Sequence, residues 1–263
     1  MRRSSGISVL IGVISTLLLT ASPAAAISHG TPDGRQHPNV GCIFGVRPDG
    51  TYTGCGTGQL ISPTVVLTAA HVFPVLESLG ATRFFVSFAS TVDPEGVKPI
   101  EADDVVLAPS FNPVSFEGQD LAVLVLTHKV AGVTPVALPA AGLLDRMKDD
   151  GSLADQTFVV VGYGEDCTGA IPCPVSLDAT RRTATESFIG LQRDKLTLLS
   201  NNAATDLGGV CFGDSGSPHF LGDSNVSVGV THAVTGNCNT AVPATRLDTS
   251  SARAFLGRFV VLP

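Results

Sequence analysis

Cys211-Phe212-Gly213-Asp214-Ser215-Gly216-Ser217-Pro218 is the most informative stretch of this 263-residue sequence. Glycines on both sides of the Asp214-Ser215 pair allow the backbone to turn tightly and to expose its N–H groups. A serine hydroxyl in such a turn is a candidate nucleophile, but it needs a neighbouring base to take its proton. Because a Gly-Asp-Ser-Gly string alone is also consistent with an ordinary loop, the base has to be sought elsewhere in the chain.

Two apolar segments supply the missing groups. His71 ends the segment Leu67-Thr68-Ala69-Ala70, where small neighbours leave room around the imidazole ring. Asp120 opens the apolar run Leu121–Leu124, which draws its carboxylate toward the interior. Alone, a histidine at a strand end is more often structural, and an aspartate before a strand more often caps a turn. Together with Ser215 they provide a nucleophile, a base and a carboxylate that can orient the base.

The composition excludes several classes of protein. Charged residues make up 15% of the chain, well below the roughly 25% of an average soluble domain, which excludes a disordered polyelectrolyte. The 28 glycines and 17 prolines suit a loop-rich all-β protein. The net charge of −7 argues against nucleic acid as a partner, because phosphate contacts need lysine and arginine.

The first 26 residues have the pattern of a secretory signal peptide. Arg2 and Arg3 precede the apolar run Ile7–Leu19, and Ala24-Ala25-Ala26 offers a cleavage site. The run is shorter than the ~20 residues of a spanning helix, although an uncleaved anchor is the alternative. No later apolar run reaches the length of a span, so we expect a secreted, extracellular protein that leaves the membrane after signal removal, with a net charge of −9.

The cysteines suggest a disulfide framework, which export permits. Six cysteines allow 15 connectivities. Cys42 and Cys55 flank a turn at 46–50 and should lie opposite each other on paired strands, within reach of a disulfide. A bridge could also pin the short loop between Cys167 and Cys173, which leaves Cys211 for Cys238. A zinc site is the alternative, but no C-x-x-C pair exists, so no metal or other cofactor is expected.

Short strands dominate the rest of the chain. They are rich in β-branched or aromatic residues and bounded by turn-forming residues, which favours a sandwich or barrel. The candidate strands are 59–61, 65–67, 84–88, 121–126, 158–161 and 226–231. Apolar residues at helical spacing predict a C-terminal helix capped by Asp248, Thr249 or Ser250.

At this point the chain resembles a known family, the trypsin/chymotrypsin-like serine endopeptidases, and in particular their secreted bacterial branch. The matching strings are Thr68-Ala69-Ala70-His71, Asp120-Leu121-Ala122-Val123-Leu124 and Gly213-Asp214-Ser215-Gly216-Ser217-Pro218, in the family's order. Gly162-Tyr163-Gly164 and Thr245-Arg246-Leu247-Asp248 add support. The resemblance implies an all-β fold of two antiparallel six-stranded barrels with a C-terminal helix. One peptidase domain would then comprise barrels at 27–135 and 136–263.

The resemblance also implies roles for single residues. Ser215 would be the nucleophile, His71 the general base, and Asp120 the group that orients His71, as in the well-characterised mechanism of this family. The N–H groups of Gly213 and Ser215 would form the oxyanion hole. A new terminal amine on Ile27 would pair with Asp214, and cleavage after Ala26 would create that terminus directly. The alternative is cleavage a few residues earlier, which would leave a short extension.

The cysteines match the family only in part. Cys211–Cys238 corresponds to the family bridge that braces the substrate pocket. Val72 replaces the common cysteine after the catalytic histidine, whereas Cys55 occupies the place of its usual partner, which supports a bridge to Cys42. Cys167–Cys173 has no family counterpart.

The expected specificity pocket has Gly209 at its base beside Val210, and Thr231, His232, Ala233 and Val234 on the opposite wall. Because no acid stands at the base, we expect apolar or small substrate side chains. Glutamate is an alternative, since some glutamate-specific relatives carry a histidine on this wall, and basic side chains are another. Protein or peptide substrates and a monomeric enzyme are expected.

Two other functions are alternatives to peptidase activity. A catalytically silent binding or adhesion module usually has a replaced triad residue, and here all three are present. An esterase of the α/β-hydrolase type requires G-x-S-x-G and the order Ser–Asp–His, and both are absent.

Overall fold

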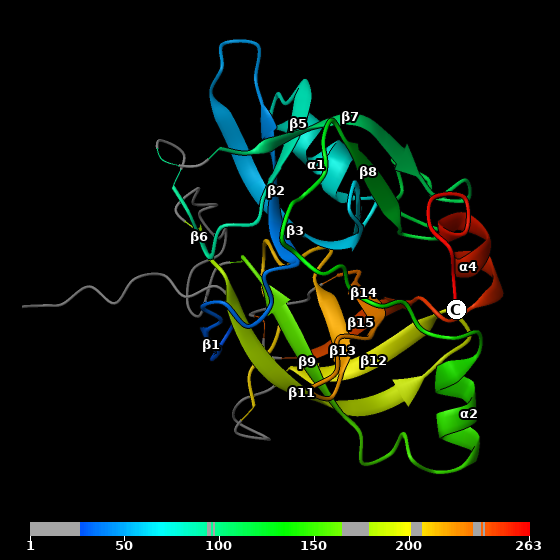
Figure 1. The fold of residues 1–263 in the computed structure, drawn as a ribbon. Helices are drawn as coiled ribbons and strands as arrows, with labels where there is room; N and C mark the ends of the chain where they lie inside the picture. Colours follow the sequence, from blue (N-terminus) through cyan, green and yellow to red (C-terminus); the bar gives the residue numbers. More distant parts are fainter. Residues whose placement is uncertain are drawn as a thin grey trace, which may run out of the picture.

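The computed structural model describes residues 27–93, 96, 98–164, 179–200, 207–233, 238 and 240–263. Two antiparallel barrels stand one above the other in Figure 1. The first closes in the order β2-β3-β4-β8-β7-β5. Its strands are β2 (Val40–Val46), β3 (Tyr52–Ser62), β4 (Val65–Thr68), β5 (Arg83–Ser87), β7 (Ile100–Leu107) and β8 (Ala122–Leu126).

The second barrel closes through the order β11-β12-β15-β14-β13-β9, because β11 also pairs with β9. Its strands are β9 (Thr157–Gly162), β11 (Arg182–Leu191), β12 (Lys195–Ser200), β13 (Pro218–Leu221), β14 (Ser227–Thr231) and β15 (Thr240–Arg246). Burial alternates along β12, where Leu196, Leu198 and Ser200 face the interior, as a strand with one core face requires. The expected two-barrel fold is therefore confirmed.

Two short strand pairs join distant parts of the chain. β1 (Thr31–Pro32) lies beside β11, so this early segment belongs spatially to the second barrel. Ile27 packs there too, in a buried cluster with Val160, Val210 and Val242. β6 (Thr91–Val92) pairs with β10 (Ala179–Thr180), which links the two halves of the chain. The expected division at residues 135 and 136 falls between β8 and β9 and stays a prediction.

Three helices accompany the strands of the described residues: α1 (Val72–Ser78), α2 (Leu143–Asp149) and α4 (Ser250–Leu256). The C-terminal helix begins as expected, because Thr249 is its N-cap and Oγ1 accepts a hydrogen bond from the Ala252 N–H at 3.3 Å. Ala252, Phe255 and Leu256 are buried in the same cluster as the core of the first barrel. The last helix therefore follows the second barrel in the sequence but packs against the core of the first. In the described part of the chain, every helix is too short or too polar to span a bilayer.

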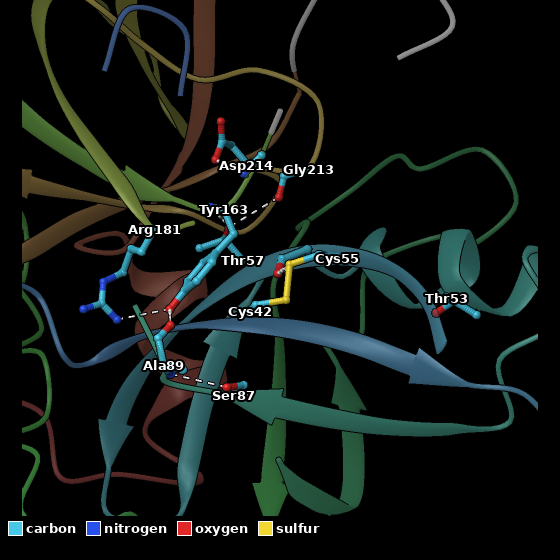
Figure 2. Close-up of a disulfide and its surroundings, with 12 residues drawn as sticks. Cys42, Thr53, Cys55, Thr57, Ser87, Ala89, Tyr163, Arg181, Gly213 and Asp214 are labelled. Carbon is cyan, nitrogen blue, oxygen red and sulfur yellow. Dashed lines mark hydrogen bonds between the residues drawn. A yellow bond between two sulfur atoms is a disulfide. The ribbon is translucent and has the colours of Figure 1, made fainter. Parts of the chain in front are cut away.

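Cys42 and Cys55 form a disulfide whose Cα atoms are 5.8 Å apart (Figure 2). The expected register was wrong, because Cys42 pairs with Thr57 and Cys55 with Phe44. A bulge between Phe44 and Val46 shifts the pairing, and Thr53 Oγ1 accepts a hydrogen bond from the Gly45 N–H there. The two cysteines are therefore diagonal neighbours. Cys211 is joined to Cys238, whereas Cys167 and Cys173 lie outside the described residues.

A buried arginine fastens the two barrels and the early segment together. The Arg181 guanidinium donates to Asp33 Oδ2 at 2.8 Å, to the Val40 carbonyl at 3.0 Å and to the Tyr163 hydroxyl at 3.1 Å. Figure 2 shows Arg181 and Tyr163 meeting beside the first barrel. The Tyr163 hydroxyl itself donates to the Ala89 carbonyl at 2.7 Å, and burial raises the Tyr163 pKa to about 12. The Arg181 cation and the neutral Tyr163 phenol therefore join the early segment to the first barrel and to the end of β9.

We predict that the hairpin disulfide can be verified chemically. Peptide mapping of the unreduced protein should recover the Cys42 peptide linked to the Cys55 peptide. Replacing both cysteines with alanine should lower the free energy of unfolding by about 3 kcal/mol, because the bridge closes a loop of 13 residues in the unfolded chain. Recovery of Cys42 linked to any other cysteine would contradict the structure.

Candidate active site

His71 lies where β4 ends and α1 begins. The four residues of β4 are all buried, and the Thr68 hydroxyl donates to the Thr57 carbonyl at 2.7 Å, which fixes the end of the strand. His71 is the N-cap of α1, and its side chain is 14% exposed. The histidine therefore stands on a rigid junction with one edge of its ring open to solvent.

Asp120 immediately precedes the buried residues that lead into β8, and its side chain is fully buried. Its Oδ2 lies 2.7 Å from His71 Nδ1, and its Oδ1 accepts the backbone N–H of His71 at 2.9 Å. On the other side of the ring, His71 Nε2 lies 2.7 Å from Ser215 Oγ. The three residues singled out from the sequence thus form one continuous hydrogen-bonded chain.

The electrostatics of Asp120 suit a permanently ionised group. Burial alone would favour the neutral acid. Hydrogen bonds from His232 and His71 outweigh that effect and hold the Asp120 pKa well below its usual range. A carboxylate is an acceptor only, so His71 Nδ1 carries the proton and His71 Nε2 is left to accept the Ser215 hydroxyl proton.

His232 is the residue for which sequence reasoning pointed to a different contact. Its expected place on the wall of the specificity pocket stays a prediction, and its Nδ1 lies 2.6 Å from Asp120 Oδ2. Nothing local in the sequence signals this contact, because the two residues are 112 positions apart. In the described part of the chain, His71, Asp120 and His232 also bring potential metal ligands within 4.8 Å of one another. Because the 2.6 and 2.7 Å separations are those of strong hydrogen bonds, we interpret the cluster as hydrogen-bonded.

The turn around Ser215 requires glycine on both sides. Gly213 and Gly216 have φ angles of 94° and 89°, a region that other residues rarely adopt. A Cβ at Gly216 would stand 2.1 Å from the Thr57 carbonyl oxygen. Thr57 of the first barrel clamps the turn, since its N–H donates to the Ser215 carbonyl at 2.9 Å and its hydroxyl to the Gly213 carbonyl at 3.3 Å (Figure 2). The first barrel therefore shapes the turn that carries the nucleophile.

Asp214, next to the nucleophile, points away from it into the second barrel. Its carboxylate accepts the N–H groups of Gly164 and Cys211, both at 2.8 Å, and that of Ile27. Complete burial raises the Asp214 pKa to about 7, with the three N–H groups opposing that rise and Glu186 adding to it. Asp214 is therefore a buried carboxylate whose ionised form is costly.

The structure gives contacts for most of the residues expected in the specificity pocket, whose role in substrate binding stays a prediction. Gly209 donates its N–H to the Ser28 carbonyl at 3.0 Å, and a Cβ there would lie 1.7 Å from Ser200 Oγ. Val210 is buried in the cluster of Ile27. Thr231 is buried and lies 2.9 Å from His219 Nε2, whose other nitrogen meets Glu186 at 2.8 Å. Ala233 is partly exposed, and Val234 lies outside the described residues.

An apolar pocket of about 240 Å³ adjoins the Ser215–His71 pair. One wall is the exposed face of α1, where Val75 and Leu79 are each 41% exposed. The remaining lining residues are Gly54, Cys55, Gly56, Val72, Leu76, Phe212 and Gly213. None of the residues expected in the specificity pocket lines this cavity, so it lies to another side of the nucleophile.

Comparisons with known proteins agree with this geometry. Residues 34–254 match the family model described as Trypsin. A collagenase from Hypoderma lineatum is 28% identical over 195 residues, which are 72% of this chain and 69% of the collagenase.

Two solved structures share the fold. The structure of HL collagenase superposes with a TM-score of 0.64 at 20% identity, over 89% of this chain and 97% of the other. A mutant of human heparin binding protein (CAP37) gives a TM-score of 0.65 at 19% identity, over 88% and 96%. Because the family model spans most of the described sequence, the chain belongs to the trypsin family of serine endopeptidases.

Proposed function

We propose that this protein is a secreted endopeptidase that hydrolyses peptide bonds through an acyl-enzyme on Ser215. The observation that carries the proposal is the unbroken chain of hydrogen bonds from Ser215 through His71 to Asp120. Because the same fold also occurs in proteins of other functions, the three hydrogen-bonded side chains indicate peptidase activity more specifically than the barrels do.

In the first half of the reaction, Ser215 Oγ attacks the peptide carbonyl while its proton moves to His71 Nε2. Asp120 stabilises the resulting imidazolium through the Nδ1–H bond. The N–H groups of Gly213 and Ser215 would receive the oxyanion, an effect worth roughly 3–4 kcal/mol per donor in related enzymes. His71 then gives its proton to the departing amine, and the acyl group stays on Ser215. In the second half, His71 takes a proton from water, which attacks the ester. His71 then returns that proton to Ser215 Oγ as the acid leaves, which regenerates the free enzyme.

The N-terminus offers a route to activation. We infer that residues 1–26 are removed as a signal peptide and that the new amine of Ile27 pairs with Asp214. Ile27 is completely buried, and its backbone nitrogen already reaches the Asp214 carboxylate. A protonated amine at that position would supply the positive charge that a costly buried carboxylate needs. Cleavage a few residues earlier would leave an extension and a zymogen.

We infer the substrate preference from the absence of an acidic side chain at Gly209, the expected base of the specificity pocket. Gly209 presents no side chain, and Ser200 fills the space beside it. We therefore favour apolar or small residues before the scissile bond, with glutamate and basic residues as alternatives. The apolar pocket against α1 borders His71, which protonates the departing amine, so it suits an apolar side chain that follows the scissile bond.

The alternative function is a silent binding module of the kind that heparin binding protein exemplifies by name. The complete triad opposes this reading, and the net charge of −7 is unfavourable for a polyanionic ligand. The bacterial branch of the family, a monomeric state and an extracellular location remain predictions from the sequence. The signal-like N-terminus and the disulfides support the extracellular location.

We predict that Ser215→Ala leaves the fold intact, because a small side chain is replaced by a smaller one. Peptidase activity should fall by several orders of magnitude, to the level supported by binding and the oxyanion hole. Hydrolysis of a peptide library by both proteins, with circular dichroism as the control for folding, measures the effect. Near wild-type turnover in the variant would remove Ser215 from its role.

We predict that sequencing of the secreted protein begins at Ile27. A variant whose mature chain carries one extra alanine before Ile27 should be folded yet nearly inactive, because the displaced amine cannot reach Asp214. The amine has an ordinary pKa near 8, which pairing raises, so activity of the native form should hold through neutral pH and fade in alkali.

The extended variant also has a stability signature. Without an ammonium partner, the folded pKa of Asp214 stays near 7 and above its unfolded value. The free energy of unfolding of the extended variant, relative to that of the native form, should therefore be greatest in acid and decline as pH rises through 7. Chemical denaturation at pH 5 and pH 8 measures this difference. Full activity in the extended variant would refute the activation proposal.

We predict that Val75→Lys lowers kcat/KM about tenfold for peptides with a large apolar residue after the scissile bond. The lysine would place a charge on the apolar wall, at a cost of roughly 1–2 kcal/mol for a partly desolvated contact. Substrates with a small chromogenic leaving group should be unaffected. Val114→Lys, at a position that is 91% exposed, is the matched control. Equal losses on both kinds of substrate would argue against a leaving-group subsite.

A further inference from the structure

Asp120 accepts hydrogen bonds from two histidines. His71 Nδ1 and His232 Nδ1 lie 2.7 and 2.6 Å from the same oxygen, Oδ2. The two rings meet edge to face, with centroids 6.3 Å apart. His71 comes from the first barrel, whereas His232 follows β14 of the second. His232 is anchored there by its backbone N–H, which donates to the Pro243 carbonyl at 3.1 Å.

The hydrogen bonds fix which ring nitrogen of each histidine carries a proton when the ring is neutral. An ionised carboxylate only accepts, so each Nδ1 must carry a proton. In both neutral rings the remaining proton-accepting atom is therefore Nε2. For His71 that atom faces Ser215 Oγ. The side chain of His232 is 24% exposed, which gives solvent protons access to its ring. Protonation of His232 would turn a neutral donor into a cation that competes with His71 for one carboxylate oxygen.

Three other ionisable side chains lie near this cluster, and each has other contacts than His232: Lys195, His219 and Glu186. Lys195 has a pKa that burial lowers from its usual value, while the charges of Asp120 and Asp194 oppose that shift, and its Nζ lies 3.0 Å from Thr245 Oγ1. His219 and Glu186 form a buried pair that reaches Thr231, the residue before His232. Successive residues of an extended chain point to opposite sides, so the His219–Glu186 pair lies on the side of Thr231 that is opposite to the His232 side chain. Among the described residues, His71 and His232 are thus the two ionisable side chains whose hydrogen bonds to Asp120 the structure shows.

We propose that His232 is a positioning residue that gives the triad a second proton switch: protonation of either histidine halts catalysis. This inference rests on the proposed function of Ser215, His71 and Asp120. When His71 is protonated, it can no longer take the Ser215 proton. When His232 is protonated, Asp120 is already paired with a cation, and the imidazolium that His71 must become in the transition state loses its stabilising partner.

Two coupled sites leave a kinetic signature. The acid limb of kcat/KM reports ionisations of the free enzyme. With one essential base, activity falls about tenfold per pH unit in acid, whereas two protonations steepen the fall toward about a hundredfold per unit. The limiting slope of log kcat/KM against pH should therefore approach two in the native enzyme. A single-histidine triad would give a slope of one.

The test compares the native enzyme with His232→Ser, in which a hydroxyl keeps a donor at the site but cannot titrate. The limiting slope should fall from about two to about one. His128→Ser replaces an exposed histidine that contacts Thr127, and it should keep the steep slope. All measurements are made with a chelator present, so that adventitious metal at the three-residue cluster does not contribute. Equal slopes in the native enzyme and His232→Ser would overturn the proposal.

A second measurement needs no turnover. In Ser215→Ala with ¹⁵N-labelled histidine, the ring nitrogens of His71 and His232 should each titrate in two steps, because each ring senses both protonations. In Ser215→Ala/His232→Ser, His71 should show a single step. Single-step curves for His71 that are unchanged by the second substitution would refute the coupling. Because this readout is independent of peptidase activity, it separates failure of this inference from failure of the proposed function.

Discussion

The buried carboxylate of Asp120 is the constraint on which the site depends. An isolated ionised carboxylate in a protein interior costs several kcal/mol unless hydrogen-bonded partners compensate it. Here the compensation comes from the backbone and ring of His71 and from the ring of His232. These donors belong to different barrels, so the charge is satisfied only when the barrels dock. The same docking brings Ser215 to His71.

Other contacts hold that docking in register. Thr57 of the first barrel clamps the turn around Ser215, and Arg181 binds the early segment, the first barrel and Tyr163 of the second half. α4 returns from the second barrel to pack on the first. Each contact joins residues that are far apart in the sequence. The site therefore depends on contacts between distant parts of the described chain, which can hold donors and acceptors in place before the substrate binds.

Sequence reasoning was most successful where the signal is local. The Gly213–Pro218 turn, the strand before His71 and the cap at Thr249 each have a short pattern with a physical cause, and their assembly into two barrels came with the family resemblance. The register of Cys42 and Cys55 was wrong because a bulge has no clear sequence signal. α1 was missed, although Pro74 in its first turn and buried Val72 and Leu76 four positions apart fit a helix. The contact of His232 with Asp120 depends on barrel docking, so no local pattern predicts it.

The central claim is that the hydrogen-bonded chain makes Ser215 a nucleophile. Labelling with a serine-directed phosphonate tests it most directly, because the reagent forms a covalent bond only with an activated hydroxyl. Intact mass should show one adduct per chain, and peptide mapping should place it on Ser215. The labelling rate should fall as the histidines become protonated in acid, and Ser215→Ala should remain unlabelled. Absence of an adduct on folded, correctly processed protein, or an adduct on another residue, would contradict this account.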